Sequence, residues 1–226
     1  MMNVAFLCSG GGGNLKFVSQ ALRMGWLQGV QICAVVSDRE CGANAHARHQ
    51  GLVTEVMDFS PAGQCQVISR LQNLHADVIV TTIHKVLIPS FLSAFKGKII
   101  NLHYSLLPAF AGKIGTRPVS EALAYGSKFV GVTVHHVSEQ VDMGRPIVQA
   151  VLSTPSKPVF DVLMNVLFRS GCIALLHAIA TIPKNRLHQA GQPCTSTWQG
   201  GQMIHFNPAV RIDPALNVEQ GWEFLS

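Results

Sequence analysis

The chain has 226 residues, of which 48% are hydrophobic and 13% are charged. This length suits one well-packed domain with a small appendage, and the composition excludes a disordered or fibrous protein. The 17 basic and 12 acidic residues give a formal charge of +5. Because the basic residues are scattered along the chain and form no stripe, this charge favours a small anionic ligand over nucleic acid.

The six cysteines form no C-x-x-C pair, so the sequence predicts free thiols in a reducing compartment. The apolar run at 4–8 is too short for the core of a signal peptide. The most apolar long stretch, 159–182, contains Asp161, Asn165, Arg169 and His177, which argue against a membrane span. We therefore expect a cytoplasmic protein without a membrane or nucleic-acid partner, and a homodimer is left open.

Short apolar runs alternate with helical patterns along the first half of the chain. The patterns predict strands at 3–8, 32–37, 54–58, 77–82 and 99–103, with helices at 15–24, 43–50 and 64–74. This alternation predicts an α/β fold with a Rossmann-like, mostly parallel sheet covered by helices on both faces.

The second half continues with strands predicted at 130–137 and 146–152, and with a helix from Pro158 to about Ala180. Four prolines then punctuate short polar segments. We expect one domain over 1–182 and a small C-terminal extension over 183–226, in which 198–206 fits a hairpin.

A glycine-rich loop joins the first predicted strand to the first predicted helix, at the carboxyl edge of the sheet where α/β proteins bind ligands. Glycines let several backbone N–H groups turn toward one point, and the helix N-terminus adds positive partial charge. Both features favour a phosphate group, although the loop matches neither G-x-G-x-x-G nor the P-loop motif, and a loop without a ligand is the alternative. The candidate phosphate-binding residues are Gly10, Gly11, Gly12, Gly13 and Asn14.

Polar residues end the strand predicted at 99–103. Asn101 and His103 are two positions apart, so they face the same side of the strand. An amide and an imidazole at the carboxyl edge of a sheet can stabilise a developing oxyanion. The spacing alone leaves a catalytic role and a structural role for the histidine equally open.

Three segments carry a resemblance to the folate-dependent formyltransferase family: NLHYSLLP at 101–108 with Gly112, GVTVH at 131–135, and VDMGRPI at 141–147. The resemblance covers roughly residues 2–180 and implies the formyltransferase fold. It also implies transfer of a formyl group from 10-formyltetrahydrofolate to an acceptor, usually an amine, without a metal. The catalytic Asn, His and Asp of the family fall on Asn101, His103 and Asp142.

In the chemistry that this resemblance implies, attack of the acceptor on the formyl carbon creates a tetrahedral oxyanion. Asn101 donates a hydrogen bond to it, His103 donates one or carries charge beside it, and Asp142 favours the imidazolium and helps to move a proton. His135 and His136 are interpreted as mainly structural. Backbone groups of two segments are expected to recognise the pterin of the donor: His84, Lys85, Val86 and Leu87, and Ser138, Glu139, Gln140 and Val141.

The acceptor side departs from the purine-pathway branch of the family. A Glu that holds the ribose in that branch has no counterpart in the Arg-Ser-Gly-Cys run at 169–172, and Tyr104 replaces a Pro. Gly11 and Gly13 replace polar residues, and the loop at 113–119 is longer. We expect a phosphorylated acceptor (a nucleotide, a phosphosugar or a glycinamide ribonucleotide-like compound) that also contacts Arg117 or Arg169, and glycinamide ribonucleotide itself is predicted to be a poor one.

Two alternatives remain. A 10-formyltetrahydrofolate hydrolase has similar stretches, but we expect such a hydrolase to carry an additional N-terminal regulatory domain and no glycine-rich loop. A folate- or nucleotide-binding module without catalysis is disfavoured, because all three catalytic residue types are present.

Overall fold

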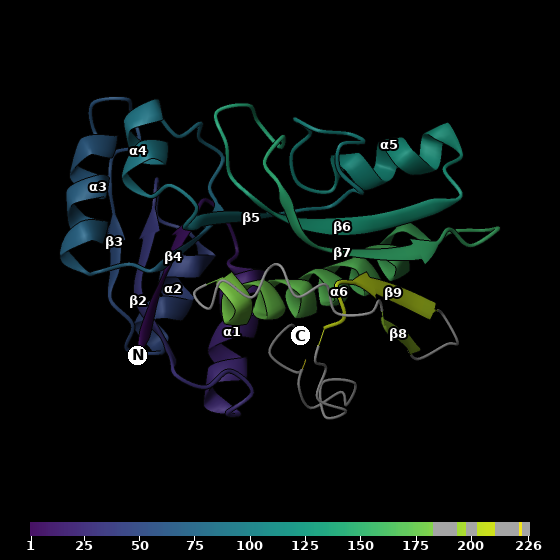
Figure 1. Ribbon diagram of the computed structural model, residues 1–226, viewed down its shortest axis with the longest axis horizontal. Helices are drawn as coiled ribbons and strands as arrows, with labels where there is room; N and C mark the ends of the chain where they lie inside the picture. The colour runs from purple at the N-terminus through teal and green to yellow at the C-terminus, as the bar shows by residue number, and fades with distance from the viewer. Residues whose placement is uncertain (183–193, 198–202, 211–221, 223–226) are drawn as a thin grey trace. The chain divides into compact units, whose positions relative to one another are not determined.

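The computed structural model describes residues 1–182, 194–197, 203–210 and 222 (Figure 1). The chain divides into two compact units, one formed by 1–101 with 213–226 and the other by 102–212. The predicted domain boundary at 182 stays a prediction.

The first unit contains a parallel sheet with the strand order β3-β2-β1-β4-β5. Its strands are β1 (Met2–Cys8), β2 (Val30–Ser37), β3 (Thr54–Val56), β4 (Val78–Thr82) and β5 (Ile99–His103), the last of which runs into the second unit. Its helices are α1 (Gly13–Arg23), α2 (Gly42–His49), α3 (Gln64–Asn73) and α4 (Pro89–Ala94).

Continuous apolar runs form the centre of this sheet. Val4, Ala5, Phe6 and Leu7 of β1 are all fully buried, as expected for a strand that has a parallel neighbour on each side and is covered on both faces. Phe17 of α1 stacks on Trp222 with ring centroids 4.6 Å apart. The predicted α/β fold with a mostly parallel sheet is thereby confirmed.

The second unit contains antiparallel strands in the order β6-β7-β9-β8. Its elements are α5 (Arg117–Tyr125), β6 (Phe129–His136), β7 (Pro146–Ser153), α6 (Phe160–Thr181), β8 (Cys194–Thr197) and β9 (Met203–Asn207). Helix α6 packs along β6 and β7 (Figure 1). The pairing of β6 with β7 requires glycine at 131, because a Cβ there would lie 2.2 Å from the carbonyl oxygen of Ala150.

Helix α6 is, among the described residues, the one helix long and apolar enough to cross a membrane by length and composition. However, 67% of its most apolar window is buried within the protein. Every residue from 170 to 176 is buried, so this part of the helix is covered on all sides. This pattern is typical of a core helix that packs on a sheet.

Several elements differ from the predicted ones. The residues 198–202, where the hairpin turn was expected, lie outside the described residues, but β8 and β9 pair antiparallel with Thr197 opposite Met203. Helices α4 and α5 were missed, although each has a proline in its first turn and Gly126 ends α5 at φ +83°. The loop expected at 113–119 therefore ends at 116.

Candidate active site

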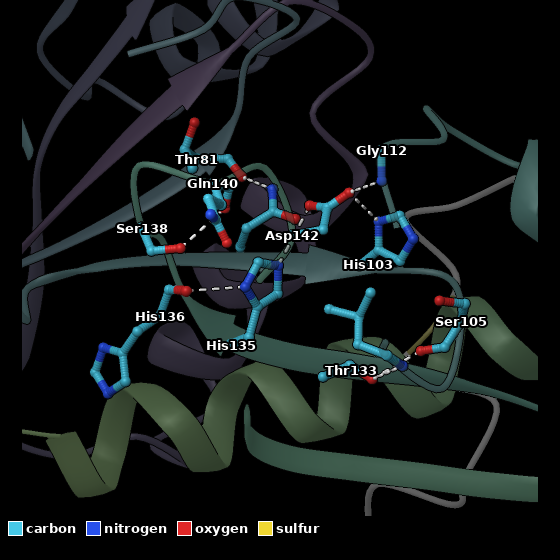
Figure 2. A network of polar contacts seen from close by, with 12 residues as sticks. Thr81, His103, Ser105, Gly112, Thr133, His135, His136, Ser138, Gln140 and Asp142 are labelled. Atoms are coloured by element: carbon cyan, nitrogen blue, oxygen red, sulfur yellow. Dashed lines mark hydrogen bonds and ion pairs between the residues drawn. The ribbon is translucent and has the colours of Figure 1, made fainter. Parts of the chain in front are cut away.

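In the second unit, the Asp142 carboxylate lies between two histidine rings (Figure 2). Its Oδ2 accepts the N–H of Gly112 at 2.7 Å and lies 3.4 Å from Nδ1 of His103. Its Oδ1 lies 3.6 Å from Nε2 of His135. The side chains of Asp142, His103 and His135 are only 13%, 7% and 2% exposed, so solvent screens electrostatic interactions among them only weakly.

The His103 ring is held from both sides. It stands at the end of β5, where Nδ1 faces Asp142 and Nε2 lies 3.2 Å from the carbonyl oxygen of Phe110. Phe110 has φ +59°, a left-handed conformation that is uncommon for a bulky residue. Because both ring nitrogens face oxygen acceptors, the imidazolium form, with a hydrogen on each nitrogen, satisfies both contacts.

Thr133 on β6 holds the chain that follows His103. Its hydroxyl donates to the carbonyl of Ser105 at 2.7 Å and accepts the N–H of Leu107 at 3.1 Å. The amide of Gln149 on β7 also donates to this hydroxyl at 3.0 Å. These buried bonds fix the segment that leads from His103 to Phe110.

The loop that carries Asp142 lies close against β6. The N–H of His136 donates to the carbonyl of Arg145 at 3.0 Å, and a Cβ at Gly144 would lie 1.6 Å from the carbonyl oxygen of His136. Only glycine fits at 144. Asp142 itself has φ +58°, a conformation that Asp and Asn tolerate better than most residues.

Asn101, two residues before His103 on β5, is oriented by a contact within the first unit. Its Nδ2 donates to the carbonyl oxygen of Thr81 at 2.6 Å. Since a carbonyl only accepts, this bond identifies the donating end of the amide. The two-residue spacing places Asn101 and His103 on the same face of the strand.

The glycines of the loop in the first unit differ in whether the fold requires them. Gly12 has φ +72°, and a Cβ there would lie 2.9 Å from Ala43, so the fold itself requires glycine. At Gly10 and Gly11, φ is ordinary and a Cβ would meet nothing within 4 Å. The fold therefore leaves room for a side chain at 10 and 11, which are also exposed.

Ser9 links the start of this loop to the segment after β4. Its hydroxyl donates to Oδ1 of Asp38 at 2.8 Å and accepts the N–H of His84 at 2.9 Å. Hydrogen bonds from the Arg39 guanidinium lower the pKa of Asp38, so the carboxylate is charged and can hold the hydroxyl in this orientation. His84, Lys85 and Val86 are exposed, whereas Leu87 is buried.

A cavity of about 660 Å³ lies within the first unit, beside this segment. It contains Lys85 and Val86, two of the four residues expected to meet the donor there. The other lining residues are Asp38, Arg39, Asp58, Phe59, Ser60, Pro61 and Gln64.

The residues expected on the acceptor side lie at two places in the second unit. Arg117 is exposed at the start of α5, where its Nε lies 2.9 Å from Oε1 of Glu121. Arg169 is half-buried on α6. The next residue, Ser170, is buried and donates to the carbonyl of Val166 at 2.7 Å. Burial also raises the pKa of Tyr104, so its phenol is neutral.

Two histidines of β6, the buried His135 and the half-buried His136, make folding sensitive to acid. Burial lowers the pKa values of His135 and His136 below the ordinary 6.5, so the unfolded chain binds protons more readily than the folded chain. This contribution to stability is complete above about pH 6.5 and is lost as the pH falls through the lowered pKa values.

We therefore expect the free energy of unfolding to decrease as the pH falls from about 7 to about 5. Urea unfolding across this range measures it, and His136→Asn is expected to flatten the dependence. A free energy that stays constant, or the same slope in the variant, would contradict the assignment.

The sequence and structure were compared with known proteins. The family model described as formyl transferase matches residues 2–167. Phosphoribosylglycinamide formyltransferase from Vigna unguiculata is 33% identical over 160 residues, which cover 66% of this chain and 50% of that protein. Formyltetrahydrofolate deformylase from Escherichia coli is 43% identical over 75 residues, which cover 33% of this chain and 26% of that protein. The chain thus spans about half the length of the first of these relatives.

A comparison with solved structures also finds a similar formyltransferase. Glycinamide ribonucleotide transformylase 1 from Symbiobacterium toebii superposes with a TM-score of 0.75 at 28% identity, covering 82% of this chain and 89% of that one. The match at 2–167 includes His103 and Asp142, whose side chains lie 3.4 Å apart. With most of its length matched by the family model, the chain belongs to the formyl transferase family.

Proposed function

We propose that the protein transfers a formyl group from 10-formyltetrahydrofolate to the amine of a small phosphorylated acceptor. The contact between Asp142 and His103, with the Gly112 N–H holding the carboxylate, is the observation that carries this proposal. A buried imidazole beside a carboxylate is suited to stabilise negative charge and to move a proton. Membership of the formyl transferase family names the group to be transferred.

The roles of the three residues follow from their contacts. As the acceptor nitrogen bonds to the formyl carbon, negative charge develops on the formyl oxygen, which Asn101 Nδ2 and the His103 imidazolium can stabilise through N–H donors. Asp142 balances the charge of His103 and accepts the proton that the acceptor nitrogen loses. Thr81 and Gly112 orient Asn101 and Asp142 in advance, so little reorganisation is needed.

We assign the donor to two segments that expose backbone groups. One is His84 to Leu87, anchored by Ser9 at one end and beside the cavity of the first unit. The other is Ser138 to Val141, which leads directly into Asp142. Recognition by backbone groups would tolerate different side chains at these positions.

The acceptor phosphate is assigned to the glycine loop. Gly10 and Gly11 are exposed glycines that the fold does not require, and they directly precede the N-terminus of α1. Backbone N–H groups and the helix dipole favour an anion at such a place. Several relatives are named after phosphoribosylglycinamide, which is a phosphorylated amine.

Incubation with 10-formyltetrahydrofolate, with and without a panel of phosphorylated amines, tests the proposal. We expect tetrahydrofolate to appear together with an equal amount of formylated acceptor, and only when an acceptor is present. Consumption of the donor in the absence of an acceptor would contradict the proposal and would identify a hydrolase. Binding without turnover under any condition would identify a non-catalytic module.

The hydrolase is a second candidate because of one observation. The identity to formyltetrahydrofolate deformylase reaches 43%, higher than to the transferase from Vigna unguiculata, although over only 75 residues. In a hydrolase, water takes the place of the amine at the same His103–Asp142 pair. The glycine loop favours the transferase. A hydrolase uses water in place of the phosphorylated acceptor, and water would not need a phosphate-binding loop.

Glycinamide ribonucleotide is expected to be a poor acceptor within the panel. Ser170 donates its hydroxyl to the Val166 carbonyl, and the run at 169–172 has no carboxylate for a ribose hydroxyl. Loss of a charged hydrogen-bond partner costs about 1.5–3 kcal/mol, at least a tenfold loss of affinity. A kcat/KM for glycinamide ribonucleotide above roughly 10⁴ M⁻¹s⁻¹, unmatched by any other acceptor, would contradict this prediction.

A further inference from the structure

The tautomer of His135 follows from a single contact. Its Nδ1 lies 2.9 Å from the carbonyl oxygen of His136. A carbonyl oxygen can only accept, so the hydrogen of the neutral ring is on Nδ1. The other nitrogen, Nε2, then presents a lone pair.

This lone pair faces Asp142. Nε2 of His135 is buried, has no hydrogen-bond partner among the described residues, and lies 3.6 Å from Oδ1 of the carboxylate (Figure 2). Two acceptors that face each other in a buried place are unfavourable until a proton lies between them. The other oxygen of Asp142 is already occupied by the Gly112 N–H and by His103.

We propose that His135 is a positioning residue that acts through Asp142, and that a proton taken up by the carboxylate is shared with His135 Nε2. This inference rests on the proposed formyl transfer and deepens it. The N–H bond of the attacking nitrogen breaks and leaves its electron pair on that nitrogen, while the proton binds between Asp142 and His135. The proton later returns to N10 of the folate, which receives the electron pair of the broken C–N bond.

The charges around His135 suit this role. Burial lowers its pKa most, the hydrogen bond to the His136 carbonyl and the Asp142 carboxylate raise it, and the nearby His103 and His136 lower it further. At neutral pH His135 is therefore uncharged and can accept a proton.

His136 supplies a matched control on the same strand. It is a half-buried neighbour whose pKa is also lowered by partial burial, but successive side chains of a strand point to opposite faces. Its ring points away from Asp142 (Figure 2). A loss caused simply by removing an imidazole from this part of β6 would thus affect both positions.

The test compares His135→Asn with His136→Asn. Asparagine at 135 keeps an amide N–H near the Nδ1 position for the His136 carbonyl but has nothing at the Nε2 position. We expect kcat of His135→Asn to fall by about 10-fold or more, with KM values nearly unchanged and the acid limb of the kcat profile displaced. His136→Asn is expected to keep both kcat and its pH profile. Equal losses in the two variants, or an unchanged profile in His135→Asn, would overturn the proposal.

A measurement on the protein without substrates tests the role of His135 independently of the proposed function. It uses no His135 variant, so it does not depend on whether that variant folds. Nitrogen NMR of the full chain reports the tautomer and pKa of His135 in the wild type and in Asp142→Asn. We expect the Nδ1–H tautomer and a lower pKa in Asp142→Asn, because the negative charge is lost. An Nε2–H tautomer or an unchanged pKa would overturn the proposal. If both expectations hold but no acceptor is formylated, the proposed formyl transfer is contradicted, whereas the proposed sharing of a proton between Asp142 and His135 is still supported.

Discussion

Asp142→Asn is expected to lower kcat by about 100-fold or more while the protein stays folded. The substitution removes the negative charge that lies 3.4 Å from His103 and that accepts the proton of the attacking nitrogen. The backbone should not change, because asparagine tolerates the left-handed conformation at φ +58° and its amide oxygen can still accept the Gly112 N–H. Steady-state kinetics and thermal unfolding measure the two effects separately.

Asp161→Asn is the matched control for this variant. Asp161 is exposed in the first turn of α6 and has no part in the site, so the same loss of charge there should leave kcat within about twofold, as expected for a surface change. If folded Asp142→Asn turned over at nearly the wild-type rate, neither the proposed role of Asp142 nor the proton sharing with His135 would survive.

Gly11→Val is expected to raise KM for a phosphorylated acceptor by at least about 10-fold, which corresponds to the loss of one hydrogen bond to a charged group. A Cβ at 11 meets nothing within 4 Å, so the protein itself has room for the side chain. The branched side chain would instead occupy the space that a phosphate needs to approach the backbone N–H groups. Position 12 is unsuitable for this test, because its φ of +72° and its contact with Ala43 would strain any substituted residue.

The donor is the internal reference for Gly11→Val. In Gly11→Val, the KM for the donor should stay within about twofold of the wild-type value, and the unfolding temperature should be unchanged, since open surface sites tolerate substitution. An equal rise in the KM of the donor, or an unphosphorylated compound as the best acceptor, would show that the glycine loop does not hold the acceptor phosphate.

Most of the fold could be predicted because the pattern of a parallel sheet is local. The strands at 3–8, 77–82 and 99–103 read as continuous apolar runs, and the structure has β1, β4 and β5 there. Helix α4 escaped prediction because its six residues carry too little periodicity. Helix α5 was also missed, although a proline in its first turn and Gly126 at its end mark it in the sequence.

The sequence by itself determined the candidate residues and the family resemblance, because motifs such as NLHYSLLP are contiguous in the chain. It also indicated the common side of Asn101 and His103, since the two-residue repeat of a strand requires it.

Only the tertiary structure decided what surrounds Asp142. Gly112 and His103 precede it by 30 and 39 positions, and no local pattern predicts that their atoms meet one carboxylate. The hydrogen bond of His135 Nδ1 to a carbonyl, which turns Nε2 toward Asp142, depends on the close passage of the 138–145 loop along β6. From the sequence, His135 is interpreted as mainly structural, because the orientation of its ring is set by packing and hydrogen bonds that residue order alone does not specify.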